Sequence, residues 1–274
     1  MIKVATIARN TADSPNMAAN DAAILERVTA LLHERGANVA AIGEEEEIPR
    51  GTQVVCSMSR TAATIERLKR AEQQGIIVIN PTTAVENCSR KQFMEILRHN
   101  GIPQPAYSII NGAAGLTSEC YPCWIKKANG WSNHKDDICY AQNSNEATRA
   151  IEQMAQRGIK EFIRMQHCTG DIVKFYGIAD RLFHYSYPGS GKFGHEEING
   201  APRHYAFDTA AFENIAQRAA RAIGLEIYGG DAIITPQGEI LIIDINDFPS
   251  FTAVREAAAA EIAQLIISKT EQTE

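Results

Sequence analysis

Two apolar segments near the end of the chain are separated by one short turn, and this pair constrains the fold more than any other feature. The segments are residues 227–234 and 239–246, and the sequence TPQG between them favours a hairpin. Both segments are apolar enough to be core strands. The chain is therefore expected to carry an antiparallel strand pair inside its core.

Polar side chains interrupt this hairpin. Asp244 and Asn246 are two residues apart, so on an extended strand their side chains leave the same face. Asp231 lies on the first strand, and the hairpin can bring its carboxylate to the other two side chains. Mg²⁺ prefers such oxygen ligands, and buried carboxylates are costly unless paired or metal-bound. The sequence predicts a metal site at Asp231, Asp244 and Asn246, the alternative being turn and cap residues at a sheet end.

The first hundred residues alternate apolar strands with helices. This order predicts a parallel sheet, and such sheets bind ligands beyond the carboxyl ends of their strands. Segments 8–17 and 57–61 follow two of those ends. The predicted strands are 2–8, 38–43, 52–58 and 75–81, and the predicted helices are 20–35, 61–74 and 89–100.

The two prolines of GIPQP predict a boundary near residue 103, beyond which the pattern becomes α+β. The predicted fold class is therefore α/β followed by α+β. Besides the hairpin, the predicted strands are 106–110, 122–127, 137–141, 161–165, 171–178 and 181–187, and the predicted helices are 145–157, 208–223 and 253–268.

Composition excludes several classes of function. A net charge of −6 argues against a nucleic-acid binder and against a polybasic membrane protein. No apolar run approaches the roughly 18 residues of a membrane helix, and MIKVATIA lacks the apolar region of a signal peptide. We expect a cytoplasmic protein. Its CxxC pair, Cys120 and Cys123, precedes an apolar strand and contains Pro122, which favours reduced structural thiols over a redox or zinc site.

Four further segments, taken with the hairpin in chain order, resemble an ATP-grasp domain. They are NCSRK (87–91), YPCWIKKANG (121–130), ANGWSNHKDD (128–137) and KEFIRMQHCTGDIVKFYGI (160–178). The resemblance covers about residues 87–260 and is closest to RimK/glutathione-synthetase-like ligases and inositol-tetrakisphosphate 1-kinase-like proteins. It implies a Rossmann-like substrate domain (1–103), a lid (104–165) and a C-terminal subdomain with the metal site (166–274), with ATP held between two antiparallel sheets.

The resemblance also implies which lysines meet the nucleotide phosphates. Lys91 matches a family lysine that reaches them, and Lys126, rather than Lys127, matches the inward lysine of the α- and β-phosphates. A phosphate would provide the partner that a lysine on an apolar strand needs. Segment 128–137 takes the place of the flexible phosphate-covering loop, although Gly130 is its only glycine and it carries Asn133 and His134.

The segment that links lid and C-terminal subdomain implies the remaining contacts. By resemblance, backbone groups of Glu161, Phe162 and Ile163 bind adenine next to a carboxylate. Lys174 fills the position of a phosphate-binding Arg or Lys, and Asp171 is expected to orient a lysine or the loop. An exposed charge on a strand or helix is the alternative for Lys174, as it is for Lys91.

These parts favour phosphoryl transfer from ATP with two Mg²⁺ ions, Mn²⁺ being an alternative ion. Catalysis would rest on positioning and electrostatics, with Lys126, Lys174 and Arg255 as catalytic residues. Arg255 could hold a carboxylate bidentately, or could be a solvated residue in the first turn of the last helix. Arg9, Arg60 and Arg181 are further candidates for the acceptor site.

The identity of the acceptor decides the function. A ligase would phosphorylate a carboxylate of an amino acid, a short peptide or another small molecule, and an amine would then attack the acyl phosphate. A small-molecule kinase would phosphorylate a hydroxyl, and Asp244, where many ligases carry glutamate, favours that branch. The acidic run at 44–47 and the few clustered cations of the N-terminal half favour the ligase. A non-catalytic nucleotide-binding protein is the third alternative. The sequence leaves the oligomeric state open, although small ATP-grasp enzymes that it resembles are often homo-oligomers, either dimers or tetramers.

Overall fold

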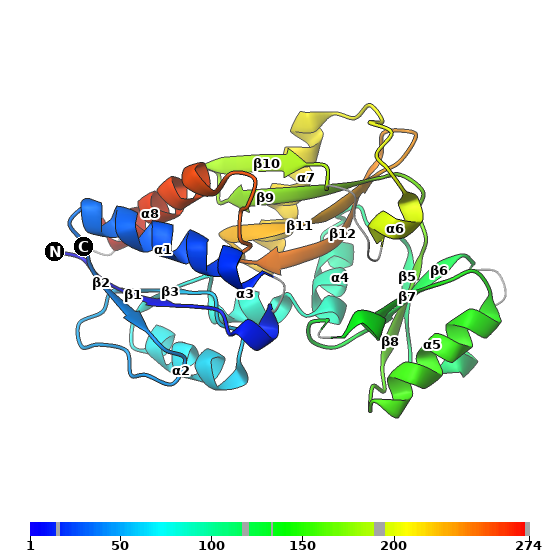
Figure 1. Ribbon diagram of the computed structural model, residues 1–274, viewed down its shortest axis with the longest axis horizontal. Coiled ribbons are helices and arrows are strands. Elements are labelled where there is room, and N and C mark those ends of the chain that lie inside the picture. Colours follow the sequence, from blue (N-terminus) through cyan, green and yellow to red (C-terminus); the bar gives the residue numbers. More distant parts are fainter. Residues whose placement is uncertain (15–16, 117–120, 133, 189–194, 272–274) are drawn as a thin grey trace.

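The computed structural model describes residues 1–14, 17–116, 121–132, 134–188 and 195–271. Within these residues the strands form three four-stranded sheets, joined and covered by helices (Figure 1). Each predicted strand and helix is present, with ends shifted by a few residues. Cys120 and Asn133, discussed above, lie outside the described residues.

The N-terminal sheet is parallel, as predicted, with strand order β2-β1-β3-β4. Its central strands, β1 and β3, are buried at every position except Lys3, because helices and neighbouring elements cover both faces. Short α3 follows Pro81 and was not predicted, because its apolar residues are too few to show a helical period. The elements are β1 (Lys3–Ile7), α1 (Ala18–Glu34), β2 (Asn38–Ile42), β3 (Val54–Ser57), α2 (Ala62–Gln73), β4 (Ile77–Ile79), α3 (Thr82–Asn87) and α4 (Arg90–His99).

The second sheet, the lid sheet, is antiparallel with order β5-β8-β6-β7. Strand alternation divides its side chains: Cys123 and Ile125 join the core beneath α5, whereas Trp124 joins the core shared with the third sheet. Cys123 is fully buried. The elements are β5 (Tyr107–Ile110), β6 (Cys123–Lys127), β7 (Ile138–Ala141), α5 (Ser144–Gln156) and β8 (Phe162–Gln166).

The third sheet, the C-terminal sheet, is antiparallel with order β10-β9-β11-β12 and contains the predicted hairpin as β11 and β12. A bulge shifts the β11–β12 register between Asp231 and Ala232. Asp208 caps the helix α7 that packs on this sheet. The elements are β9 (Asp171–Ile178), β10 (Leu182–Ser186), α6 (His195–Asn199), α7 (Thr209–Ile223), β11 (Ile227–Ile234), β12 (Ile240–Asp247) and α8 (Arg255–Glu271).

The cores cross the boundary predicted near residue 103. Helix α4 shares a core with α7 and both antiparallel sheets, through residues such as Phe93 and Leu97. The last helix, α8, returns to the N-terminal domain and lies beside α1, where Ile262 and Ile266 meet Ile24 (Figure 1). Among the described residues, no helix has both the length and the apolar character to cross a membrane.

Candidate active site

The candidate metal ligands lie in two rows across the C-terminal sheet. Lys174 on β9 is paired with Asp231 on β11, and Asp231 is paired with Asp244 on β12. In the next row, Tyr176 and Asn246 flank Gly229. Residues two apart on a strand share a face, so both rows present their side chains to the same side. The structure thus brings Asp231, Asp244 and Asn246 together.

Short contacts hold these side chains. Lys174 Nζ lies 3.0 Å from Asp231 Oδ1, and Asn246 Nδ2 donates to Asp244 Oδ2 at 2.8 Å. Two carboxylates directly opposite each other on adjacent strands repel, so the Asp231–Asp244 pair needs a cation nearby. Lys174 supplies one positive charge against two negative charges. The carboxylate oxygens of Asp231 and Asp244 and the amide oxygen of Asn246 are the hard oxygen ligands that fit Mg²⁺.

Gly230, next to Asp231, is required by the close approach of β12. A Cβ at this position would lie 2.2 Å from the backbone oxygen of Asp244 and 2.6 Å from the ring of Phe175. Any larger residue would push the two strands apart. The GGD sequence therefore permits the tight pairing that sets Asp231 against Asp244.

Lys126 approaches this region from the lid sheet. It follows Trp124 on the same face of β6 and is 3% exposed, with no ion pair to any described residue. Burial and the nearby charge of Arg90 lower the pKa of Lys126 to about 7, although Asp244 and Asp231 raise it. Near neutral pH this amine is only partly protonated, and a bound anion would favour its charged form.

Arg90 is a second buried cation, at the first position of α4. Its Nη1 donates to the Lys127 backbone oxygen at 2.7 Å and its Nη2 to Ser132 Oγ at 2.8 Å. Arg90 therefore ties α4 to the start of the 128–137 loop. Sequence reasoning chose its neighbour Lys91, because nothing in the local pattern tells which of two adjacent cations faces inward.

Lys91 instead contacts Glu161, the residue just before β8. Its Nζ lies 2.7 Å from Glu161 Oε1, and Asn129 donates to the other oxygen of the same carboxylate. The hydrogen bond from Lys91 lowers the pKa of Glu161, and the pKa of Lys91 is raised in return. Lys91 and Glu161 are thus close together, but as partners of each other.

The other nucleotide candidates occupy different environments. Phe162 and Ile163 lie within β8, where β5 and β6 pair with them on either side, so their backbone groups serve the sheet. Asp171 is 3% exposed and accepts hydrogen bonds from the backbone nitrogens of Arg203 and Tyr205, at 2.7 and 2.8 Å. Asp171 therefore anchors the segment before α7. The His134 ring accepts from the Asp136 nitrogen and so caps a short turn.

The turn that follows β12 is unusual. Phe248 and Phe251 are both fully buried and adopt positive φ angles of 38° and 48°, which non-glycine residues rarely do. This conformation turns two backbone oxygens toward the N-terminal domain. Arg9, which follows β1, donates to the oxygens of Asp247 and Phe248 at 3.3 and 2.7 Å. Its Nε also lies 3.4 Å from Asp21 on α1.

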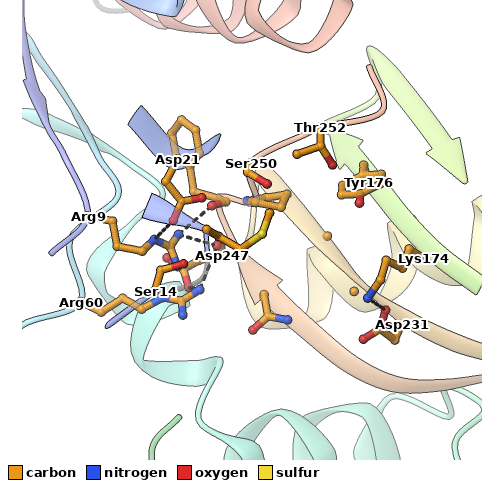
Figure 2. Close-up of a pocket in the computed structure, with 16 residues that line it drawn as sticks. Arg9, Ser14, Asp21, Arg60, Lys174, Tyr176, Asp231, Asp247, Ser250 and Thr252 are labelled. Atoms are coloured by element: carbon orange, nitrogen blue, oxygen red, sulfur yellow. Dashed lines mark hydrogen bonds and ion pairs between the residues drawn. The ribbon is translucent and has the colours of Figure 1, made fainter. Parts of the chain in front are cut away.

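A cavity of about 380 Å³, called here the acceptor cavity, lies between this turn, the C-terminal sheet and the N-terminal domain (Figure 2). Residues of both segments predicted to bind ligands, 8–17 and 57–61, line it. A smaller one of about 220 Å³, called here the phosphate cavity, lies toward the lid. The acceptor cavity is lined by Arg9, Ser14, Met17, Asp21, Arg60, Lys174, Tyr176, Gly229, Gly230, Asp231, Asn246, Asp247, Phe248, Pro249, Ser250 and Thr252, and the phosphate cavity by Asp13, Arg60, Cys88, Arg90, Phe93, Gly130, Trp131, Ser132, Ile138, Asp244 and Asn246.

Solved structures share this architecture over nearly the whole chain. An ATP-grasp protein with a RimK domain from Sphaerobacter thermophilus matches with a TM-score of 0.72 and 14% identity, covering 96% of this chain and 98% of that one. D-alanine–D-alanine ligase from Bacillus anthracis, complexed with ATP, matches with a TM-score of 0.72 and 12% identity, over 100% and 98%. The protein has the ATP-grasp fold. The predicted fold class is therefore confirmed.

Other ATP-grasp proteins extend the comparison. The ATP-grasp ligase PsnB, complexed with a minimal precursor, Mg and ADP, has a TM-score of 0.69 and 16% identity, over 98% of each chain. In sequence, a D-alanine–D-alanine ligase of Oleidesulfovibrio alaskensis is 28% identical over 190 residues, 62% of this chain and 60% of the relative. A probable alpha-L-glutamate ligase of Trichodesmium erythraeum is 23% identical over 217 residues, 75% and 71%.

The chain thus spans about three fifths of the length of the first of these relatives. No family model matches the sequence. The resemblance to RimK-like ATP-grasp ligases that the motifs indicate is nevertheless supported by sequence relatives and by solved structures alike.

Two predicted acceptor residues lie outside both cavities of the ATP-grasp fold. Arg255, at the start of α8, donates to Asn20 Oδ1 at 2.8 Å on α1. Arg181 donates to Ser268 Oγ at 3.2 Å on α8. Neither lines the acceptor cavity or the phosphate cavity. Arg9 and Arg60 do line the acceptor cavity. In the sequence, both lie just after predicted parallel strands, where ligands bind in such sheets.

Proposed function

We propose that this protein is an ATP- and Mg²⁺-dependent ligase that joins a carboxylate to an amine, with an amino acid or a short peptide as the acceptor. The observation that carries the proposal is the balance of positive and negative side chains that line the acceptor cavity, next to the candidate metal ligands. The names of the relatives, which are ligases of amino acids or of a precursor peptide, support the same reaction class.

The lining of the acceptor cavity contains three cations and three carboxylates. The cations are Arg9, Arg60 and Lys174, and the carboxylates are Asp21, Asp231 and Asp247. Arg9 faces Asp21, Arg60 faces Asp247 and Lys174 faces Asp231, so each positive charge is already matched. A polyphosphorylated substrate would need a surplus of positive charge. This balance favours a compact zwitterion over the phosphorylated substrate of an inositol-phosphate-kinase-like enzyme.

The residues around the two cavities would have two roles toward the nucleotide, phosphate binding and Mg²⁺ binding. Lys126, Arg90 and Lys174 would bind phosphate oxygens, and the two buried cations would gain the anionic partner that they lack. Asp231, Asp244 and Asn246 would hold Mg²⁺, which when bound withdraws charge from the phosphate oxygens. The buried positions of Lys126 and Arg90 exclude water, which strengthens their attraction for charge that develops in the transition state.

The reaction then has two steps. A carboxylate oxygen of the acceptor forms a bond to the γ-phosphorus while the bond from that phosphorus to the bridging oxygen breaks, and ADP leaves with the electron pair. The amine next attacks the acyl carbon, phosphate leaves, and the amine gives up a proton. Ser250, Thr252 and Tyr176 line the acceptor cavity and can donate hydrogen bonds to a polar acceptor.

The test is to incubate the protein with ATP, Mg²⁺ and amino acids or dipeptides, singly and in pairs, and to follow phosphate and organic products together. We expect equal amounts of ADP, free phosphate and a new amide. A phosphorylated product without free phosphate would show a kinase instead. ATP that stays intact with every substrate would favour a nucleotide-binding protein without catalysis.

A further inference from the structure

Arg60 forms part of the wall between the two cavities. It follows β3 in the N-terminal domain, and it lines the acceptor cavity as well as the phosphate cavity. Asn246 is the only other described residue that lines both. Asn246 belongs to the candidate metal site. Arg60 is therefore the one positively charged described residue that lines both cavities. In Figure 2 its side chain reaches from the N-terminal domain toward Asp247.

The guanidinium of Arg60 contacts Asp247 at the end of β12 and Trp131 in the 128–137 loop. Its Nη2 lies 2.6 Å from Asp247 Oδ1 and donates to the Asp247 backbone oxygen at 3.1 Å. The side chains of this pair are 9% and 1% exposed. In the 128–137 loop, the centroid of the Trp131 ring lies 5.3 Å from Arg60 Cζ, within the range of a cation–π contact.

Arg60 retains unused donors in this position. Both contacts with Asp247 use Nη2, and the buried Nε has no hydrogen-bond partner among the described residues. Burial lowers the pKa of Arg60, but the attraction and hydrogen bond of Asp247, together with Cys88 and Asp244, raise the pKa overall, so the group stays a cation. A planar guanidinium with free N–H groups is suited to carboxylate and phosphate oxygens. A buried donor without a partner is also costly, and a bound ligand would remove that cost.

We propose that Arg60 is a catalytic residue that contacts both the acceptor carboxylate and the phosphoryl group during its transfer. The proposal rests on the proposed ligase function and assigns a residue within it. Arg60 remains protonated throughout: it donates hydrogen bonds while the carboxylate oxygen bonds to phosphorus and ADP departs. Trp131 packs on the same guanidinium, so the position of the phosphate-covering loop and that of Arg60 depend on each other.

The experiment uses hydroxylamine as the amine, because it traps acyl phosphates as hydroxamates. Wild-type protein is first assayed with ATP, Mg²⁺, hydroxylamine and each of the common amino acids or dialanine. The carboxylate that reacts is then used with Arg60→Lys and Arg60→Ala. The matched control is Arg70→Ala, which removes an exposed arginine of α2 whose side chain makes no hydrogen bond or ion pair with a described residue. Melting temperatures show whether each variant is folded.

We expect Arg60→Lys to lower kcat about 100-fold, as loss of a transition-state donor does, with KM for ATP changed less than threefold. Added guanidine should restore part of the activity of Arg60→Ala, a recovery that a purely structural role of Arg60 would not show. Arg9→Lys, which alters the acceptor cavity alone, should raise the acceptor KM more than it lowers kcat.

Different outcomes would overturn the two proposals separately. A wild-type protein that forms no hydroxamate with any carboxylate would defeat the ligase function, and the role of Arg60 with it. A wild type that forms hydroxamate, together with a folded Arg60→Lys variant of equal kcat, would defeat the role of Arg60 alone. A rise in acceptor KM without loss of kcat would reduce Arg60 to a binding residue and would also overturn the assignment.

Discussion

The lid sheet and the C-terminal sheet bring opposite charges to the region between them. Lys126 comes from the lid sheet, and Arg90 comes from α4 and is bonded to the end of β6. Both are buried without a carboxylate in an ion pair among the described residues. From the C-terminal sheet come Asp231 and Asp244, with Lys174 as the one cation in their row. Neither side is neutral by itself. The proposed ligand, a nucleotide with a divalent cation, would satisfy both sides at once.

The largest expected effect comes from the acidic side of this comparison. Asp244→Asn keeps the size of the side chain but removes a charged oxygen ligand, so Mg²⁺-dependent ATP turnover should fall at least about 1,000-fold. The measurement is ADP formation across a Mg²⁺ titration, with circular dichroism to check the fold. Asp180→Asn, in the exposed turn between β9 and β10, is the control and should keep full activity. Turnover above a tenth of wild type in Asp244→Asn would remove this residue from the metal site.

The basic side provides a sharper test, because two adjacent cations differ in environment. Arg90→Met removes a buried cation that also fixes the 128–132 loop, and we expect turnover to fall about 100-fold. Lys91→Met removes only the partner of a partly exposed Glu161, and less than a threefold change is expected. Steady-state kinetics on both variants make the comparison. The reverse order of effects would restore Lys91 as the phosphate ligand that the sequence predicts.

The smallest effect is a pH dependence that only the buried lysine should produce. In the free protein Lys126 has a pKa of about 7, and bound phosphate favours its charged form. Between pH 7.5 and 9, binding must therefore take up a proton, and ADP affinity should weaken up to about tenfold per pH unit. His195 nearby stays neutral in this range, because burial lowers its pKa well below the usual value.

Isothermal titration of ADP at several pH values, in buffers of different ionisation enthalpy, measures that proton uptake. Lys126→Arg is the comparison, because arginine stays charged at every pH used and should flatten the profile. Equal pH profiles for wild type and Lys126→Arg would show that Lys126 is already charged before the nucleotide binds. The charge difference between the two sheets would then be present in the free protein.

Much of the architecture could be predicted from the sequence, because local patterns determine it. Alternation along β12 put Asp244 and Asn246 on one face, and the hairpin gave them Asp231. On β6, the choice of Lys126 over Lys127 came from the resemblance to ATP-grasp domains, and Lys126 is the buried one of the two. Prediction was weaker where the local pattern is short, as for α3, or where neighbours in sequence differ only in what they meet in space, as for Arg90 and Lys91.

The sequence by itself therefore determined the elements, the fold class and the row of oxygen ligands, since strand period and turn chemistry act over a few residues. Only the tertiary structure decided which cations share a cavity with those ligands. Arg60 meets Asp247 across 187 residues of chain, and Arg9 meets Phe248 across 239. Arg255 donates to Asn20, 235 residues away along the chain, and therefore lies outside both cavities. Such contacts depend on how distant elements pack, and no local pattern records that packing.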